Sequence, residues 1–286
     1  MVDKKLIVVK HNDLIKAAYK LSILESRIVL SCIARINSKG MLSSTDKFSI
    51  HVSEIADLVP DHSNLYINLK DAVDRLSERW VYFLEPSSRS REMKTRWVYS
   101  VDYVHDEGRI NLFFSPHIIP FLSELTRDFT QYKLEHVSRF KSSYSIGFYE
   151  LFKSYQSSKK ILTIDWIKEH FQIEDKYDRT DSLQLKVIKP AMEDINNHSD
   201  MKVEWKSIKQ GRKIVSFEFT FVTREDNSRK ISKKFDRDRI EGVLKADLDK
   251  YANPGESYSQ AATRLKAEQL MLEKTGKPTT LDILWK

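Results

Sequence analysis

The sequence predicts an α+β protein made of two copies of one unit, in which helices are followed by a β-ribbon. The first observation is residues 176–222, which read as one helix followed by a two-stranded ribbon. The second is an earlier stretch, residues 48–115, with the same order of short strand, capped helix, second helix and ribbon. A helix with a basic outer face before a basic hairpin is the outline of a winged helix. We therefore expect two tandem winged-helix domains related by pseudo-duplication, with a charged C-terminal tail.

The helix of the second unit is predicted over residues 182–196. Four polar residues recur at spacings of four, three and four and so share one helical face: Ser182, Lys186, Lys189 and Glu193. The opposite side is apolar, with Ile188, Ala191, Met192 and Ile195. Pro190 lacks a backbone N–H and is expected to bend this helix.

The ribbon of the second unit is predicted as strands over 202–208 and 213–222. Gln210-Gly211 is typical of a turn, and residues 214–222 alternate in polarity as a half-buried strand does. Four cations surround the turn: Lys206, Lys209, Arg212 and Lys213.

The first unit is predicted to begin with a short strand or arm over residues 1–10 and a helix from Asn12 to about Ile36. A strand over 48–50, a helix over 54–59 capped by Ser53, and a helix over 64–78 follow. Strands are expected at 80–84, 96–104 and 109–114, with a polar loop over 86–94 that carries Arg89, Arg91 and Lys94.

The connection to the second unit is predicted as a short helix over 118–125 and a long helix over 135–156. A strand over 161–164 and a helix over 166–171 capped by Asp165 then repeat the first unit's order. We place the domains at residues 1–125 and 126–223. Residues 224–286 are expected to be a basic tail, partly helical (259–274) or disordered.

Composition limits the possible functions. The net charge of +7 over 286 residues favours an anionic partner. No apolar run approaches the ~20 residues that span a bilayer, and the N-terminal apolar run is too short for a signal peptide, so we expect a cytoplasmic protein without membrane contact. The single cysteine, Cys32, excludes internal disulfides, and the seven glycines form no phosphate-binding loop. The eight histidines form no HxH or HxxxH pair, so no metal, cofactor or catalytic residue is expected.

The repeated unit suggests a geometry on duplex DNA. The second helix of a winged helix enters the major groove, and the hairpin contacts the adjacent backbone or minor groove. In the second domain the expected DNA contacts are Arg179, Thr180, Ser182, Lys186, Lys189, Lys206, Lys209, Arg212 and Lys213. In the first domain they are Lys70, Arg89, Arg91 and Lys94. Because Asp71 and Asp74 share the outward face of the first domain's helix and would repel phosphates, we expect the second domain to carry most base readout.

Several spaced motifs resemble one family. Those motifs are residues 129–134 (FTQYKL), 142–145, 148–152 (FYELF), 177–179, 187–191 (VIKPA), 194–196 and the hairpin residues 211–213. Over residues 8–222 the chain resembles the plasmid replication initiators of the RepA/RepE type, which bind directly repeated origin sequences, or iterons. One departure is Gln184-Leu185, where a more basic run is common in some members.

The resemblance implies two winged-helix domains joined by a long helix, and no catalytic residues. It implies that monomers bind the origin repeats, melt a nearby AT-rich segment and recruit the host's initiator, helicase and primase. It also implies an inactive homodimer, joined through the first domain, that represses its own gene.

Two alternatives remain. One is a transcriptional repressor with the same two domains, which would bind one inverted repeat rather than tandem direct repeats. The other is a rolling-circle nickase that uses a tyrosine, against which the missing histidine pair argues.

Overall fold

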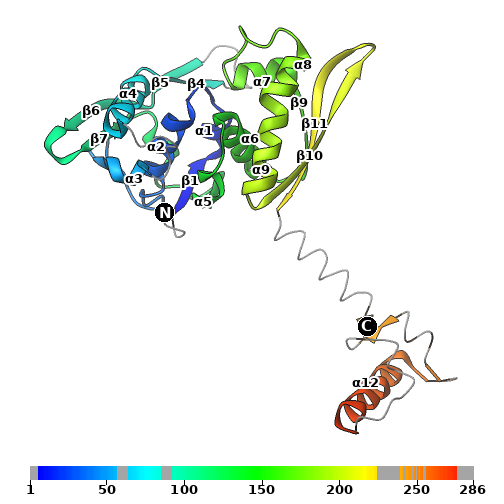
Figure 1. Ribbon diagram of the computed structural model, residues 1–286. Helices are drawn as coiled ribbons and strands as arrows, with labels where there is room; N and C mark the ends of the chain where they lie inside the picture. The colour runs from blue at the N-terminus through cyan, green and yellow to red at the C-terminus, as the bar shows by residue number, and fades with distance from the viewer. Residues whose placement is uncertain are drawn as a thin grey trace. The chain divides into compact units, whose positions relative to one another are not determined.

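The computed structural model describes residues 6–56, 64–84 and 92–223, and within the C-terminal part residues 239–240, 243–245, 248, 250, 252–253 and 256–275. Residues up to Val222 form one compact unit, and the chain from Thr223 onward forms a second unit. Figure 1 shows the helices and strands of both units.

The N-terminal region contains two strands and two short helices, and the single helix predicted from Asn12 to Ile36 is not formed. The elements are β1 (Ile7–His11), α1 (Asn12–Lys16), β2 (Ala18–Tyr19) and α2 (Ile23–Ile33). The prediction was wrong because Ser22 starts a new helix through a capping box. The Ser22 hydroxyl accepts from the Glu25 N–H at 3.2 Å, and the Glu25 carboxylate accepts from the Ser22 N–H at 3.0 Å.

The first winged helix contains β3 (Phe48–His51), α3 (Val52–Ala56) and α4 (Leu65–Ser77), followed by β4 (Trp80–Leu84), β5 (Glu92–Arg96), β6 (Val98–Val104) and β7 (Arg109–Phe114). Strands β3, β7 and β6 form one antiparallel sheet, and β2, β4 and β5 form another. The strand predicted over 96–104 is interrupted at Trp97, whose side chain is fully buried. Helix α3 begins at Val52, so Ser53 lies within its first turn and does not precede it as a cap.

The connection is also more broken than predicted. It contains the 3₁₀ turn η2 (Ile119–Phe121), β8 (Phe129–Lys133), α5 (Glu135–Ser138) and α6 (Ser143–Ser154). The single helix expected over 135–156 is wrong, because Ser142 is extended and its hydroxyl accepts from the Tyr144 N–H to start α6. Strand β8 pairs antiparallel with β1.

The second winged helix contains β9 (Lys159–Thr163), α7 (Ile164–His170), α8 (Thr180–Leu183), the π-turn η3 (Gln184–Ile188) and α9 (Lys189–His198). The hairpin of β10 (Met201–Gln210) and β11 (Lys213–Thr223) completes it. The sheet has the order β10-β11-β9, so the hairpin is anchored by the strand that precedes α7. Thr163, rather than the predicted Asp165, caps α7, since the Thr163 hydroxyl accepts from the Trp166 N–H at 3.1 Å.

Helix α6 joins the two halves of the unit (Figure 1). It contacts α1, α2 and β8 on one side and α9 on another, and most of its side chains are buried. A helix that is apolar around most of its circumference belongs inside a core. Gly147 lets Phe171 approach this helix, because a Cβ at residue 147 would lie 2.5 Å from the Phe171 Cε1 atom.

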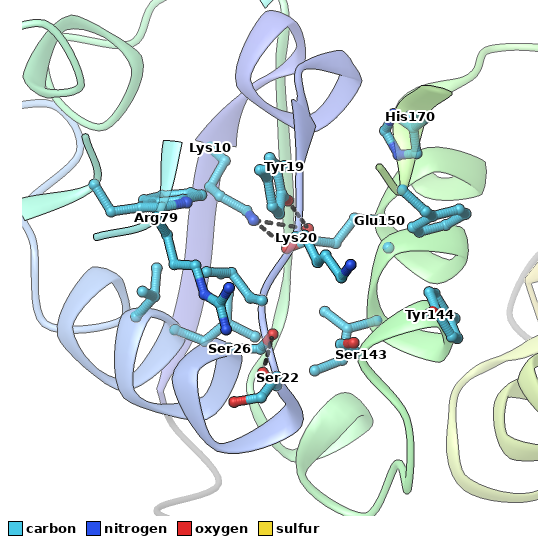
Figure 2. A pocket seen from close by; sticks show the side chains of 17 residues that line it. Lys10, Tyr19, Lys20, Ser22, Ser26, Arg79, Ser143, Tyr144, Glu150 and His170 are labelled. Carbon is cyan, nitrogen blue, oxygen red and sulfur yellow. Dashed lines mark hydrogen bonds and ion pairs between the residues drawn. The ribbon is translucent and has the colours of Figure 1, made fainter. Parts of the chain in front are cut away.

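A buried ion pair fixes α6 to the N-terminal strand, as Figure 2 shows. The Lys10 ammonium lies 2.7 Å from one oxygen of Glu150 and 2.6 Å from the other. The hydroxyls of Tyr132 and Tyr19 also donate to this carboxylate. Burial, followed by the charge of Glu150, raises the pKa of both tyrosines well above the ordinary value, so both remain donors. A cavity of about 190 Å³ lies beside this network.

Two aspartates connect α9 and the turn after it to α6 and the turn before it. Asp194 accepts from the Ser145 hydroxyl at 2.7 Å and from the Lys141 N–H at 2.8 Å. Asp200 accepts from Tyr149 at 2.8 Å and from Lys153 at 2.6 Å. Because these carboxylates are hydrogen-bonded, α9 is held in one position against the rest of the unit.

The C-terminal unit contains β12 (Arg239–Ile240), β13 (Val243–Leu244) and α12 (Tyr258–Thr275), close to the helix predicted over 259–274. A small cluster of buried side chains holds these elements together: Val243, Leu248, Ala261, Ala262 and Leu265.

Candidate nucleic-acid interface

The segments α8, η3 and α9 form one continuous helical stretch with a widened turn in its middle. The Lys189 N–H donates to the Gln184 carbonyl, five residues earlier, which is the spacing of a π-turn. Pro190 follows immediately and has no N–H to donate to the carbonyl four residues before it. The hydrogen-bonding pattern of the helix therefore changes to a π-turn just before Pro190.

One face of this stretch is packed into the core. The buried side chains are Leu183, Val187, Ile188, Ala191, Met192 and Ile195. The opposite face is exposed and carries Asp181, Leu185, Lys186, Lys189 and Glu193. The predicted basic face is thus present, but it includes two carboxylates and one large apolar side chain.

The predicted helix contacts differ in how free they are. Lys186 is exposed and makes no ion pair within the described part of the chain. Lys189 lies 4.0 Å from Glu193, and the Arg179 guanidinium lies 3.4 Å from Asp181. Thr180 and Ser182 are half-buried at the start of α8. Lys186 is therefore the cation of this helix that is most available to a ligand.

The β10–β11 hairpin presents three exposed cations at its tip. The turn is Gly211-Arg212, in which Gly211 has a φ of 61°, a conformation that side chains disfavour. Lys209, Arg212 and Lys213 are exposed and have no ion pair among the described residues. Figure 1 shows this tip and the α8 end of the helical stretch pointing to the same end of the domain.

Lys206 lies further from the tip and is not free. Its ammonium lies 3.0 Å from Glu218 on β11, and Lys159 on β9 lies 2.7 Å from the same carboxylate. Hydrogen bonds from Lys159 and Lys206 lower the pKa of Glu218. The ion pairs join all three strands of the sheet, so Lys206 has a structural partner as well as its predicted role.

In the first domain the two predicted contacts that the structure describes, Lys70 and Lys94, lie against other side chains. The Lys70 ammonium lies 2.9 Å from Asp74 and 5.1 Å from the centre of the Tyr103 ring. Asp74 also accepts from the Tyr103 hydroxyl, and this bond, followed by that from Lys70, lowers the pKa of Asp74. Lys94 is exposed on β5, with its ammonium 5.0 Å from the centre of the Trp80 ring. Arg89 and Arg91 lie outside the described residues.

The sequence reasoning gave no role to Leu185 or Asp181. Both lie in the exposed stripe 181-185-189-193, whose spacing of four is readable in the sequence. The stripe is not recognised when only basic residues are taken as DNA contacts, because one of its members is apolar and two are acidic.

The described residues contain no group of three or more His, Cys, Asp or Glu side chains that could hold a metal ion. None of their helices is long and apolar enough to span a bilayer.

Comparison with known proteins identifies both domains. Residues 7–153 match the family model described as "Initiator Replication protein, WH1", and residues 163–221 match "Initiator Rep protein, WH2". The chain is 27% identical over 208 residues to a replication initiation protein of Escherichia coli, a match that covers 70% of this chain and 65% of that relative. It is 25% identical over 260 residues to the PI protein of Escherichia coli, covering 79% of this chain and 85% of the relative.

A solved structure has the same fold. It is described as the Pi initiator protein in complex with iteron DNA, and it superposes with a TM-score of 0.64 at 24% identity over 78% of this chain and 99% of that one. The predicted fold of two tandem winged helices is confirmed, and the family favours an initiator over the repressor alternative. The chain belongs to the initiator replication protein family, with a WH1 domain followed by a WH2 domain.

Proposed function

We propose that this protein initiates plasmid replication in the bacterial cytoplasm by binding directly repeated origin sequences, with the WH2 domain carrying most of the base readout. The observation that carries the proposal is the set of cations Lys186, Lys209, Arg212 and Lys213. They are exposed, lack ion pairs within the described part of the chain, and belong to the helix and hairpin tip of one domain.

The chemistry of these groups suits duplex DNA. A helix placed in the major groove brings Lys186 to base edges or phosphates, where a lysine can donate to the guanine O6 and N7 atoms. The hairpin tip places three positive charges against the adjacent backbone, where each neutralised phosphate releases counterions. The structural relative with the same two-domain fold is described as a complex with iteron DNA, which supports this arrangement.

The WH1 domain has a different role in the proposal. On α4, Asp71 and Asp74 are exposed and Lys70 is paired with Asp74, so this helix is a poor ligand for phosphates. We assign WH1 to backbone contacts through Lys94 on β5 and to a homodimer that is inactive in initiation and represses the protein's own gene.

Opening of an AT-rich segment and recruitment of the host's initiator, helicase and primase complete the proposed role. No step in it is catalytic. Purified protein incubated with origin DNA and Mg²⁺ should therefore leave both strands intact, and strand nicking would overturn this part of the proposal.

The test of the proposal is binding of the full-length protein to a duplex that contains the direct repeats beside its gene, followed by fluorescence anisotropy. Replacing Lys186 or Arg212 with Ala should weaken binding. A side chain that reads a base should cost about 1–3 kcal/mol of binding free energy when it is removed. A side chain that contacts a phosphate should instead reduce the slope of log affinity against log salt by about 1.

Lys133→Ala is the matched control, because Lys133 lies on β8 beside Glu135 and outside the proposed interface. It should bind like the unaltered protein. Equal affinity of all three variants for the repeat would show that the interface lies elsewhere, and a binding constant independent of salt would contradict DNA binding through phosphates.

A further inference from the structure

We propose that Leu185 is a specificity-determining residue, which reads the repeat by contacting the C5-methyl group of a thymine in the major groove. This inference rests on the proposed function, since it assigns a role to one side chain of the proposed reading helix.

Leu185 is unusual for its position. Its side chain is 63% exposed, whereas Leu183, Ile188 and Ile195 of the same helical stretch are buried. Lys186 follows it directly, and Asp181 and Lys189 lie four residues to either side on the exposed stripe. A single exposed leucine on an ordinary surface needs no explanation, but this one is the apolar member of the face that is proposed to enter the groove.

The local backbone holds Leu185 outward. It is the second residue of the π-turn, and Val187 and Ile188 of the same turn are buried against the core. The buried neighbours fix the turn from behind, and the widened backbone projects Leu185 and Lys186 together. Asp194, one helical turn beyond Pro190, anchors the same stretch to α6 through Ser145. The leucine is thus presented by a supported element rather than by a mobile loop.

The DNA side offers one matching group. The thymine C5-methyl is the one methyl group that a base edge presents in the major groove, where the other groups that distinguish the base pairs are hydrogen-bond donors and acceptors. Leucine can neither donate nor accept, so within the groove a thymine methyl is the partner that it can distinguish. The neighbouring Lys186 can neutralise a phosphate or donate to guanine. Leu185 and Lys186 would therefore contact different chemical groups of the same site.

The experiment removes that methyl group alone. Each thymine of one repeat is replaced in turn by uracil, which keeps all base-pair hydrogen bonds, and binding of the full-length protein is measured by anisotropy. One position should weaken binding by roughly threefold to tenfold, as expected for losing one buried methyl contact. With Leu185→Ala the same substitution should change binding less than twofold, while other positions keep their effects. Leu185→Met should restore part of the sensitivity.

Two controls separate this role from a loss of structure. Leu185→Ala should keep the thermal midpoint and the salt slope of the unaltered protein, because the side chain is exposed and uncharged. Met41→Ala removes another exposed apolar side chain, 86% exposed in the WH1 domain, and should leave the whole uracil profile unchanged.

The outcomes distinguish the two proposals. Salt-dependent binding of the repeat with a uracil profile that is the same for Leu185→Ala and the unaltered protein overturns the role of Leu185 and leaves the proposed function intact. Absence of specific binding to the repeat by the unaltered protein overturns both.

Discussion

The buried pair of Lys10 and Glu150 gives the sharpest test of what holds the helical junction together. Lys10 is 2% exposed and Glu150 is 1% exposed, so neither charge has appreciable access to water. The two groups are 2.6–2.7 Å apart, and the Tyr132 and Tyr19 hydroxyls supply further donors to the carboxylate. Removing one partner would leave the other as an uncompensated buried charge.

We expect Glu150→Leu to destabilise the protein by about 3–5 kcal/mol, the usual cost of breaking a buried ion pair from one side. For a compact unit of 222 residues, 1 kcal/mol corresponds to a shift of about 2–4 °C in the melting temperature, so the expected fall is roughly 6–20 °C. Lys10→Met should cost a similar amount, because the carboxylate is then left without its cation.

The double variant Lys10→Met, Glu150→Leu separates charge from packing. Two apolar side chains of similar volume can replace a buried pair at little net cost, so the double variant should be more stable than either single variant. Urea denaturation followed by circular dichroism gives the three free energies. Additive effects of the two substitutions, or a loss below 1 kcal/mol for Glu150→Leu, would refute the view that these charges depend on each other.

Three further predictions concern the packing at Gly147, the buried His170 and the proposed homodimer. Gly147→Ala should destabilise the unit by about 1–3 kcal/mol in urea denaturation, because the new Cβ would lie 2.5 Å from Phe171. The Phe171 ring packs against the rings of Tyr144 and Phe148 and cannot easily move away. An unchanged denaturation midpoint would contradict this packing. Burial lowers the pKa of His170 from 6.5 to about 4. As the pH falls, the unfolded state therefore binds a proton at a higher pH than the folded state does. The free energy of unfolding should fall from pH 7 to pH 5 by up to about 1.4 kcal/mol per pH unit. His170→Gln should flatten this decline, and an equally steep decline in the variant would assign it to other groups. The proposed homodimer through WH1 predicts a concentration-dependent monomer–dimer equilibrium in sedimentation velocity, and a single monomeric species up to high micromolar concentration would contradict it.

The sequence predicted the order of elements well where short-range signals mark them. The helix over residues 65–77, the hairpin around Gly211 and the apolar face of α9 follow from periodicity and turn residues that act locally. The breaks before α2 and α6 were missed because apolar periodicity continues across them. In both places a serine caps the next helix, and a serine amid helical periodicity is a weaker signal than the periodicity itself.

The sequence predicts which residues form the candidate site, but it predicts few of the ion pairs that those residues make. Charge and spacing are enough to select Lys186 and the cations at the hairpin tip. The Lys70–Asp74 pair is readable, because the two residues lie four apart on one helix. The partner of Lys206 depends on the register between strands, and the Tyr103 ring beside Lys70 comes from a distant strand, so the sequence does not reveal either locally. The sequence also does not predict the π-turn, because a proline within a helix indicates that the helix is disturbed but not which backbone geometry results.

Hydroxyl-radical footprinting of the full-length protein on the DNA that flanks its gene tests whether the WH2 helix and hairpin bind directly repeated DNA. We expect regularly spaced protected segments over tandem repeats, which disappear when Lys186, Arg212 and Lys213 are replaced together by Ala. A single protected inverted repeat, or protection that persists unchanged in the triple variant, would contradict it.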